Sequence, residues 1–148
     1  MRNFLHECYK IEQLAAKTYQ QFAERMDYPE NIRQIFQEMA DDEMEHARII
    51  DMVIQTPGHE LVVTPGLSAG QVDEKLRLAK ALLVSAEHSD LSADAALQLA
   101  LDAEAQLVEV HANQSLIPGN PEMTDFFSTL TQYDCEHVDK LRACLDAS

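Results

Sequence analysis

Apolar residues recur at steps of three and four over four long stretches of the chain, a pattern that predicts helices with one buried face. Each of these faces is interrupted by carboxylates or histidines. The interrupting residues are Glu12, Glu43, His46, Glu104, Asp134 and His137. Placing a charged group among apolar side chains costs several kcal/mol unless that group is paired or binds a metal ion. These six residues therefore constrain the fold more than any other feature of the sequence.

The polar interruptions repeat along the chain. Glu12 and Glu104 are 92 residues apart, and the Glu43-x-x-His46 segment is followed 91 residues later by an Asp-x-x-His segment. The dipeptide Pro29-Glu30 also recurs after 92 residues. The chain is therefore predicted to contain two helical hairpins related by a pseudo-twofold axis.

The same periodicity predicts a helix at about 3–26, a second that ends at about 55, and two more at about 92–114 and 121–145. Asp27, Ser92 and Asn120 are the expected N-caps of the last three. Short links join the first two and the last two helices, so each pair should be antiparallel. The predicted fold class is all-α, a four-helix bundle. A long crossover between its second and third helices should itself be helical at about 68–87, and one domain of residues 1–148 is expected from the length.

Helix geometry places the polar residues at one level of this bundle. At ~1.5 Å per residue, Glu12 and the segment from Glu43 to His46 lie roughly 23–27 Å from the turn that joins their helices. The polar residues of the second hairpin lie at a similar height. Residues at i and i+3 share a helix face, so each carboxylate-x-x-His pair can act together, and all six side chains can converge.

A cluster of four carboxylates and two imidazoles suits two divalent cations of the iron or manganese type. Its four negative charges balance the charges of two such ions. Structural zinc sites use thiolates or more imidazole, and calcium sites use oxygen ligands. The pattern therefore predicts two iron ions as cofactors, with manganese as the other choice.

The residue pattern resembles the ferritin-like superfamily of di-iron carboxylate proteins, and most of all its rubrerythrin-type branch. The segments that carry the resemblance are I-E-Q-L-A-A-K-T-Y, D-D-E-M-E-H-A, A-E-A-Q-L-V-E-V-H and Y-D-C-E-H-V. The resemblance implies that Glu12 and Glu104 are terminal ligands and that Glu43 and Asp134 bridge the two metals. It also implies that His46 and His137 each bind one metal.

The chain departs from the family pattern in three ways. Asp134 stands where the family has Glu, so we expect Asp134 to bind one metal only and the metal near His137 to be the weaker one. Leu107 stands where rubrerythrins carry a further ligand Glu. The rubredoxin-like segment of full rubrerythrins is not present in this sequence, which contains no C-x-x-C pair.

Two further polar residues fall on the apolar faces. Tyr19 is either a core residue with a tethered hydroxyl or a hydrogen-bond partner of a ligand. His111 is either a partner of a ligand carboxylate or a satisfied core histidine. Cys8 and Cys135 lie close to the predicted ligands, and we expect them to pack in the core rather than act as redox thiols.

Charge and composition exclude several classes of partner. The formal net charge is −15, which repels nucleic acid and anionic lipid, so neither nucleic acid nor a membrane is an expected partner. No apolar run approaches the ~20 residues that a membrane span needs. The first ten residues lack the apolar region of a signal peptide. With three cysteines and no paired motif, a cytoplasmic location with reduced thiols is expected.

The predicted function is a di-iron or di-manganese carboxylate oxidoreductase that reacts with peroxide or O₂, similar to rubrerythrins, and takes electrons from an external donor protein. The expected assembly is a homo-oligomer, a dimer. Two alternatives remain open: an iron oxidation, storage or handling protein of ferritin-like type, and a metal-poor helical interaction module. Metal content separates the second alternative from the other two functions.

Overall fold

The computed structural model describes residues 2–55, 69–115 and 121–147. These residues form five α-helices and no strand, so the predicted all-α class is confirmed. The helices are α1 (Arg2–Ala23), α2 (Glu30–Gln55), α3 (Ala69–His88), α4 (Ala93–Ser115) and α5 (Pro121–Asp146). None of the helices in the described ranges combines the length and the apolar character that crossing a membrane requires.

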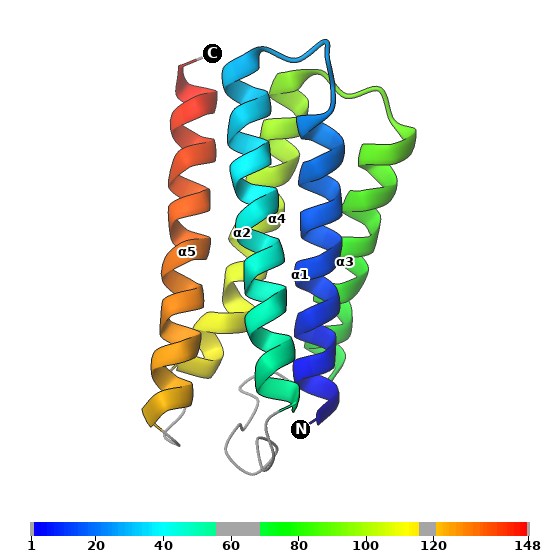
Figure 1. Ribbon diagram of the computed structural model, residues 1–148. Coiled ribbons are helices and arrows are strands. Elements are labelled where there is room, and N and C mark those ends of the chain that lie inside the picture. The colour runs from blue at the N-terminus through cyan, green and yellow to red at the C-terminus, as the bar shows by residue number, and fades with distance from the viewer. Residues whose placement is uncertain (1, 56–68, 116–120, 148) are drawn as a thin grey trace.

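The helices form a bundle of two antiparallel hairpins, with α3 lying on its outside (Figure 1). α1 packs along α2, and α4 packs along α5. α3 lies against α1 and α4 and carries the chain back along the length of the bundle, so that α4 begins at the end where α1 finishes. The expected helical crossover between the two hairpins is therefore confirmed.

Apolar clusters fill the bundle on both sides of a polar layer. One cluster includes Tyr19, Phe22, Phe36, Leu97 and Leu141. The other includes Leu5, Ile50, Val110, Phe127 and Leu130. On each of the four long helices the polar residues fall between the members of the two clusters. Burying one large apolar side chain stabilises the fold by about 1.5–3 kcal/mol, so these clusters offset the cost of the polar layer.

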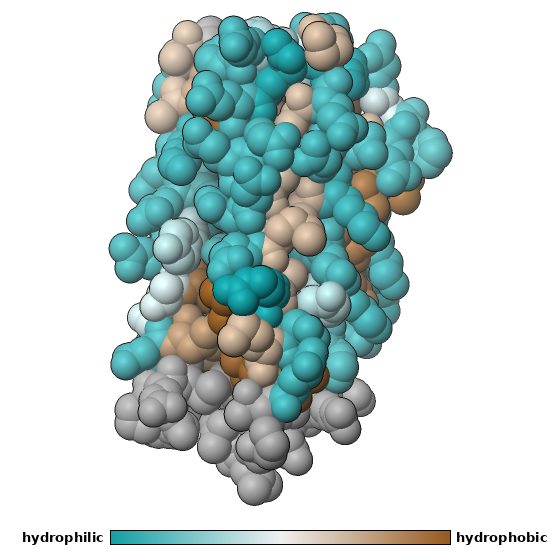
Figure 2. Space-filling view, in the orientation of Figure 1, coloured by the Kyte–Doolittle hydropathy of each residue, from teal (hydrophilic) through white to brown (hydrophobic). Residues whose placement is uncertain are grey.

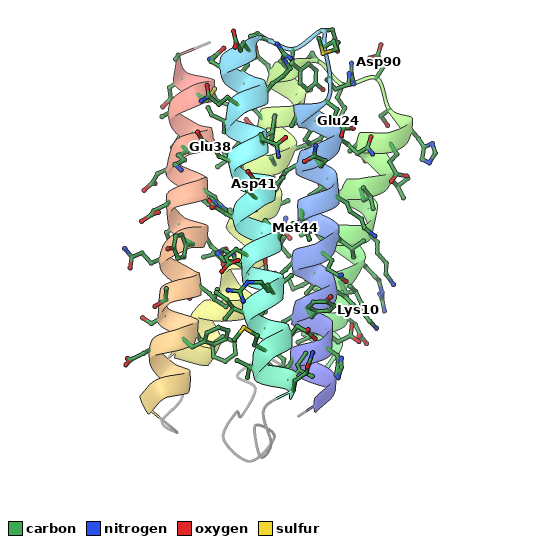
Figure 3. The ribbon with its side chains drawn as sticks, viewed as in Figure 1. Lys10, Glu24, Glu38, Asp41, Met44 and Asp90 are labelled. Atoms are coloured by element: carbon green, nitrogen blue, oxygen red, sulfur yellow. The ribbon has the colours of Figure 1, made fainter. Side chains whose placement is uncertain are left out.

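A smaller apolar cluster fixes the crossover helix to the bundle. Leu76 and Ala79 of α3 pack there against Ile11 of α1 and Leu107 of α4. Leu107 is thus part of an apolar wall beside the polar layer. Other charged side chains point away from the bundle, as Glu38 and Asp41 of α2 and Glu24, just after the end of α1, do in Figure 3.

The end of α1 and the start of α2 differ from the predicted ones. α1 ends at Ala23, and Met26 is 80% exposed, so it is not part of the apolar face. Asp27 does not cap α2, because both its carboxylate oxygens accept hydrogen bonds from Arg25, each at 2.8 Å. The backbone amides of Ile32 and Arg33, in the first turn of α2, donate to the carbonyl of Pro29 at 3.1 and 3.0 Å.

The N-cap predicted for α4 is confirmed. The Ser92 hydroxyl accepts a hydrogen bond from the backbone amide of Ala95 at 3.1 Å, the geometry of an N-cap serine. Asn120, the predicted cap of α5, lies outside the described residues.

Candidate metal centre

The six polar residues singled out in the sequence meet in the layer between the two apolar clusters. Each of them exposes 3% or less of its surface. They are contributed by all four long helices: Glu12 by α1, Glu43 and His46 by α2, Glu104 by α4, and Asp134 and His137 by α5. Two helical hairpins that are far apart in sequence therefore supply one buried site.

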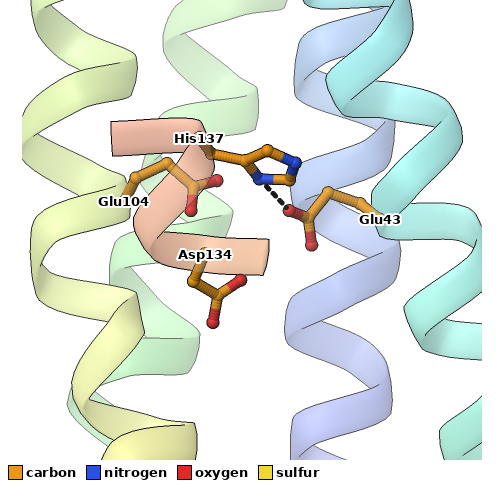
Figure 4. Close-up of side chains that lie close together, drawn as sticks. All are labelled: Glu43, Glu104, Asp134 and His137. Atoms are coloured by element: carbon orange, nitrogen blue, oxygen red, sulfur yellow. Dashed lines mark ion pairs between the residues drawn. The ribbon is translucent and has the colours of Figure 1, made fainter. Parts of the chain in front are cut away.

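The ligand atoms form two groups that share one residue. Glu43, Glu104, Asp134 and His137 make up the first group, here called the His137 half (Figure 4). Glu12, Glu43 and His46 make up the second, the His46 half. Within each group the candidate ligand atoms all lie within 4.8 Å of one another.

Glu43 belongs to both halves, the position expected of a bridging carboxylate. Asp134 belongs to the His137 half alone. That it serves one metal stays a prediction. The His137 half thereby has four candidate ligands, and the His46 half has three. The expectation that the metal near His137 is the weaker one does not follow from this arrangement.

Both histidines direct Nδ1 toward the carboxylates of the centre. Nδ1 of His46 lies 3.7 Å from Oε2 of Glu12 and 3.6 Å from Oε2 of Glu43. Nδ1 of His137 lies 3.1 Å from Oε1 of Glu43. Even so, Oε1 of Glu43 and both Nδ1 atoms are buried without a hydrogen-bond partner among the described residues.

Unpaired buried polar atoms are rare because each one costs free energy. Three such atoms from two helices border the centre, and one cation in each half would supply them with partners. A cavity of about 10 Å³, room for about one water-sized sphere, lies among Glu12, Glu43, Glu104 and Asp134. The donor set and the space between the donors therefore fit metal ions.

Two carboxylates of the centre, Glu43 and Glu104, have pKa values above the usual value for glutamate. Burial raises the pKa of Glu43, and the nearby carboxylate of Glu12 raises it further. Burial likewise raises the pKa of Glu104 well above its usual value, with added repulsion from Glu43 and Asp134. Burial and mutual repulsion thus disfavour the charged forms of Glu43 and Glu104.

The pKa values of the two histidines are also raised, which favours their charged forms. Burial lowers the pKa of His46, but Glu12 and Glu43 outweigh this effect and raise it to about 11. Burial also lowers the pKa of His137, and Glu43 again prevails, so that the pKa rises to about 9. Without metal, protons supply the positive charge that the carboxylates require.

Tyr19 holds Glu104 in place. Its hydroxyl donates a hydrogen bond to Oε1 of Glu104, and its ring stacks on Phe36 with the centroids 6.0 Å apart. Burial raises the pKa of Tyr19 well above its usual value, so the hydroxyl keeps the proton that it donates. The core position and the hydrogen bond considered for Tyr19 therefore both occur. The side chain of His111 lies outside the described residues.

Two residues that the sequence pattern did not single out contact the histidines on the side away from the carboxylates of the centre. Asp42 places Oδ2 2.9 Å from Nε2 of His137. Tyr133 packs its ring against His46, with the centroids 5.3 Å apart. Each lies one position before a candidate ligand carboxylate, and the two are 91 residues apart. The internal repeat makes the two positions equivalent, but it does not show which side chains they contact.

The two cysteines near the centre differ in burial. Cys8 is buried, as expected, and lines the small cavity beside Glu12. Cys135 follows Asp134 in sequence but is exposed, so the expectation that it packs in the core is wrong. One residue along a helix is a rotation of about 100°, which takes Cys135 from the inner face to the surface.

Comparison with known proteins gives one family. The sequence model of the family described as Rubrerythrin matches residues 3–145. No curated protein and no solved structure matches the chain. The matched region contains all six residues of the centre and agrees with the resemblance in the sequence motifs.

Proposed function

The chain belongs to the rubrerythrin family, and we propose that it is a di-iron oxidoreductase that reduces peroxide or O₂. The buried Glu and His cluster is compatible with a di-iron site. The observation that carries the proposal is the set of buried atoms without a hydrogen-bond partner at its middle, namely Oε1 of Glu43 and Nδ1 of His46 and of His137. These atoms are two imidazole nitrogens and a carboxylate oxygen, which are ligands that iron accepts.

In this proposal each half of the centre holds one metal ion. Glu104, Asp134 and His137 would hold the first, Glu12 and His46 would hold the second, and Glu43 would contribute to both. A pair of ferrous ions bound there would supply two electrons, which with two protons would reduce hydrogen peroxide to two molecules of water. Manganese fits the same ligand types.

Residues around the centre hold two of its candidate ligands in position. Tyr19 fixes the orientation of Glu104 by donating a hydrogen bond. Asp42 pairs with Nε2 of His137, so Nδ1 remains directed at the centre. The formal net charge of −15 favours the approach of ferrous ions to the surface.

Electrons for repeated turnover come from outside these 148 residues in this proposal. The sequence has no C-x-x-C pair that could form a rubredoxin-type iron site. In this proposal an external electron-donor protein would re-reduce the centre. We also propose that the chain forms a dimer, and light scattering on the same preparations measures its oligomeric state.

The test is to measure metal content first and reactivity second. Protein purified without chelator should contain about two iron or manganese ions per chain, as expected for this ligand set. The ferrous protein, mixed with peroxide in the absence of air, should consume about one peroxide per pair of iron ions. The Glu43→Ala/His46→Ala double variant is the control and should do neither.

Other outcomes lead to the alternative functions. Iron retained well beyond two ions per chain, with slow peroxide consumption, would point to iron storage or handling. Absence of bound metal after loading with ferrous iron would refute the oxidoreductase and leave a metal-poor helical module.

A further inference from the structure

The two halves of the centre differ in the number of protein ligands that they offer. Four residues converge on the His137 half and three on the His46 half, counted over the part of the chain that the structure describes. Asp134 accounts for the difference. Its side chain is one methylene shorter than that of Glu43, about 1.5 Å in reach, and its carboxylate groups with His137 but not with Glu12 and His46.

The two halves also differ in their distance from the surface. A groove of about 190 Å³ runs between α2 and α5, and its walls include Asp42, His46, Phe126, Thr129 and Tyr133. Figure 2 shows apolar side chains gathered between these two helices in the lower part of the view. His46 lines this groove, whereas His137 does not.

The ring of His46 therefore forms the wall between the groove and the centre. Its Nδ1 faces Glu12 and Glu43 on the inside, and its ring contacts Tyr133 on the groove side. His137 lies one side chain further from the groove, because its outer nitrogen pairs with Asp42, which lines the groove. The His46 half thus lies directly behind a ring that lines the groove, whereas the His137 half lies behind both Asp42 and the His137 ring.

We propose that the His46 half is the exchangeable half of the centre, the position where the second metal binds more weakly and where a small external ligand such as peroxide binds, with access through the α2–α5 groove. This inference rests on the proposed binding of two metals. A metal with fewer protein ligands keeps more positions for water or other small molecules. The ligand count and the position of the groove lead to the same half independently.

The first test is a titration of the metal-free protein with Co²⁺, followed by its visible absorption and by calorimetry. We expect a tight step and a second step weaker by at least about tenfold, the loss caused by removing even an outer partner of a ligand. His46→Gln should abolish the weaker step and keep the tight one. Circular dichroism verifies that the variant is folded.

The decisive variant is Asp134→Glu, which restores the missing methylene. Its carboxylate should reach both halves and should tighten the second step while the first stays unchanged. Asp139→Glu is the matched control, since it makes the same change at an exposed position of the same helix, and it should leave both steps as they are.

Azide is the probe for the external ligand. Azide should alter the Co²⁺ spectrum only after the second step is complete, and it should have no effect on the His46→Gln variant. Thr129→Trp, which fills the groove, should slow azide binding several-fold without changing the first metal step. Ser128→Trp, at a neighbouring exposed position outside the groove, should bind azide at the normal rate.

Each outcome separates this inference from the proposed function. Two equally tight Co²⁺ steps, or no effect of Asp134→Glu on the second step, would overturn the inference but leave a di-metal oxidoreductase possible. Azide binding after the first step alone would assign the external ligand to the His137 half and would also overturn it. Failure to bind any Co²⁺ would refute both proposals.

Discussion

The carboxylate of Asp42, on α2, lies 2.9 Å from Nε2 of His137, on α5. The next residue, Glu43, lies 3.1 Å from Nδ1 of the same imidazole. Two consecutive residues of one helix therefore hold the two nitrogens of a histidine on the opposite hairpin. This pairing fixes the ring orientation and joins α2 to α5 at a point where these helices otherwise make few contacts.

Removing the outer carboxylate should weaken the His137 half. Asp42→Ala leaves Nε2 of His137 without its partner, so the ring is free to rotate and less basic. We expect a loss of about 10–100-fold in affinity for the first Co²⁺ ion, the usual effect of removing such a partner. Asp41→Ala, at an exposed position (Figure 3), should not change affinity. Equal affinities in the two variants would show that Asp42 does not position the ligand.

The two ligands on α2 should have unequal effects when they are replaced. Glu43 belongs to both halves of the centre and His46 to one. After loading and gel filtration, Glu43→Ala should retain almost no metal, and His46→Ala should retain about one ion per chain, the number of complete halves that it keeps. Glu45→Ala is the control, since Glu45 is exposed and pairs with Arg48. Full metal content in Glu43→Ala would disprove the shared position of Glu43.

Much of this arrangement follows from helix geometry alone. The rise of 1.5 Å per residue places Glu12 and Glu43 at one height whatever the details of packing. The fixed interval between the hairpins does the same for Glu104 and Asp134. The polar layer and the number of long helices could therefore be predicted from the sequence.

Features that depend on how neighbouring helices are rotated could not be predicted. Asp42 and Tyr133 meet the histidines only because α2 and α5 face each other at one particular angle. The half that Asp134 serves is decided by about 1.5 Å of side-chain reach, which the periodicity does not resolve. Just after the end of α1, Arg25 pairs with Asp27 and also with Asp90, and the second contact joins residues far apart in sequence.

The metal-free protein should lose stability as the pH rises from about 6.5 to 9. The pKa values of His46 and His137 rise to about 11 and about 9, above the value of about 6.5 in an unfolded chain. The pKa values of Glu43 and Glu104 are also raised. Groups that bind protons more tightly when folded stabilise the protein below their unfolded pKa, and this contribution is lost as the pH rises through the folded pKa.

Urea denaturation of the chelator-treated protein at pH 6, 7.5 and 9 measures this effect. The midpoint should fall at each step, and the His46→Gln variant should show a smaller fall. A midpoint that is constant over this range would mean that the carboxylates and histidines are not in contact in the metal-free protein.

The hydrogen bond from Tyr19 to Glu104 should contribute to stability whether or not metal is bound. Both residues are buried, and Tyr19→Phe leaves a carboxylate oxygen of Glu104 without its donor. The expected loss in the free energy of unfolding is about 1–3 kcal/mol, the cost of an unsatisfied buried acceptor. Tyr9→Phe is the matched control, because the Tyr9 hydroxyl is half-buried and accepts a hydrogen bond from Gln13 at 3.0 Å. Its cost should be below about 1 kcal/mol. Equal losses in the two variants, measured on chelator-treated protein, would show that the Tyr19 hydroxyl does not stabilise Glu104.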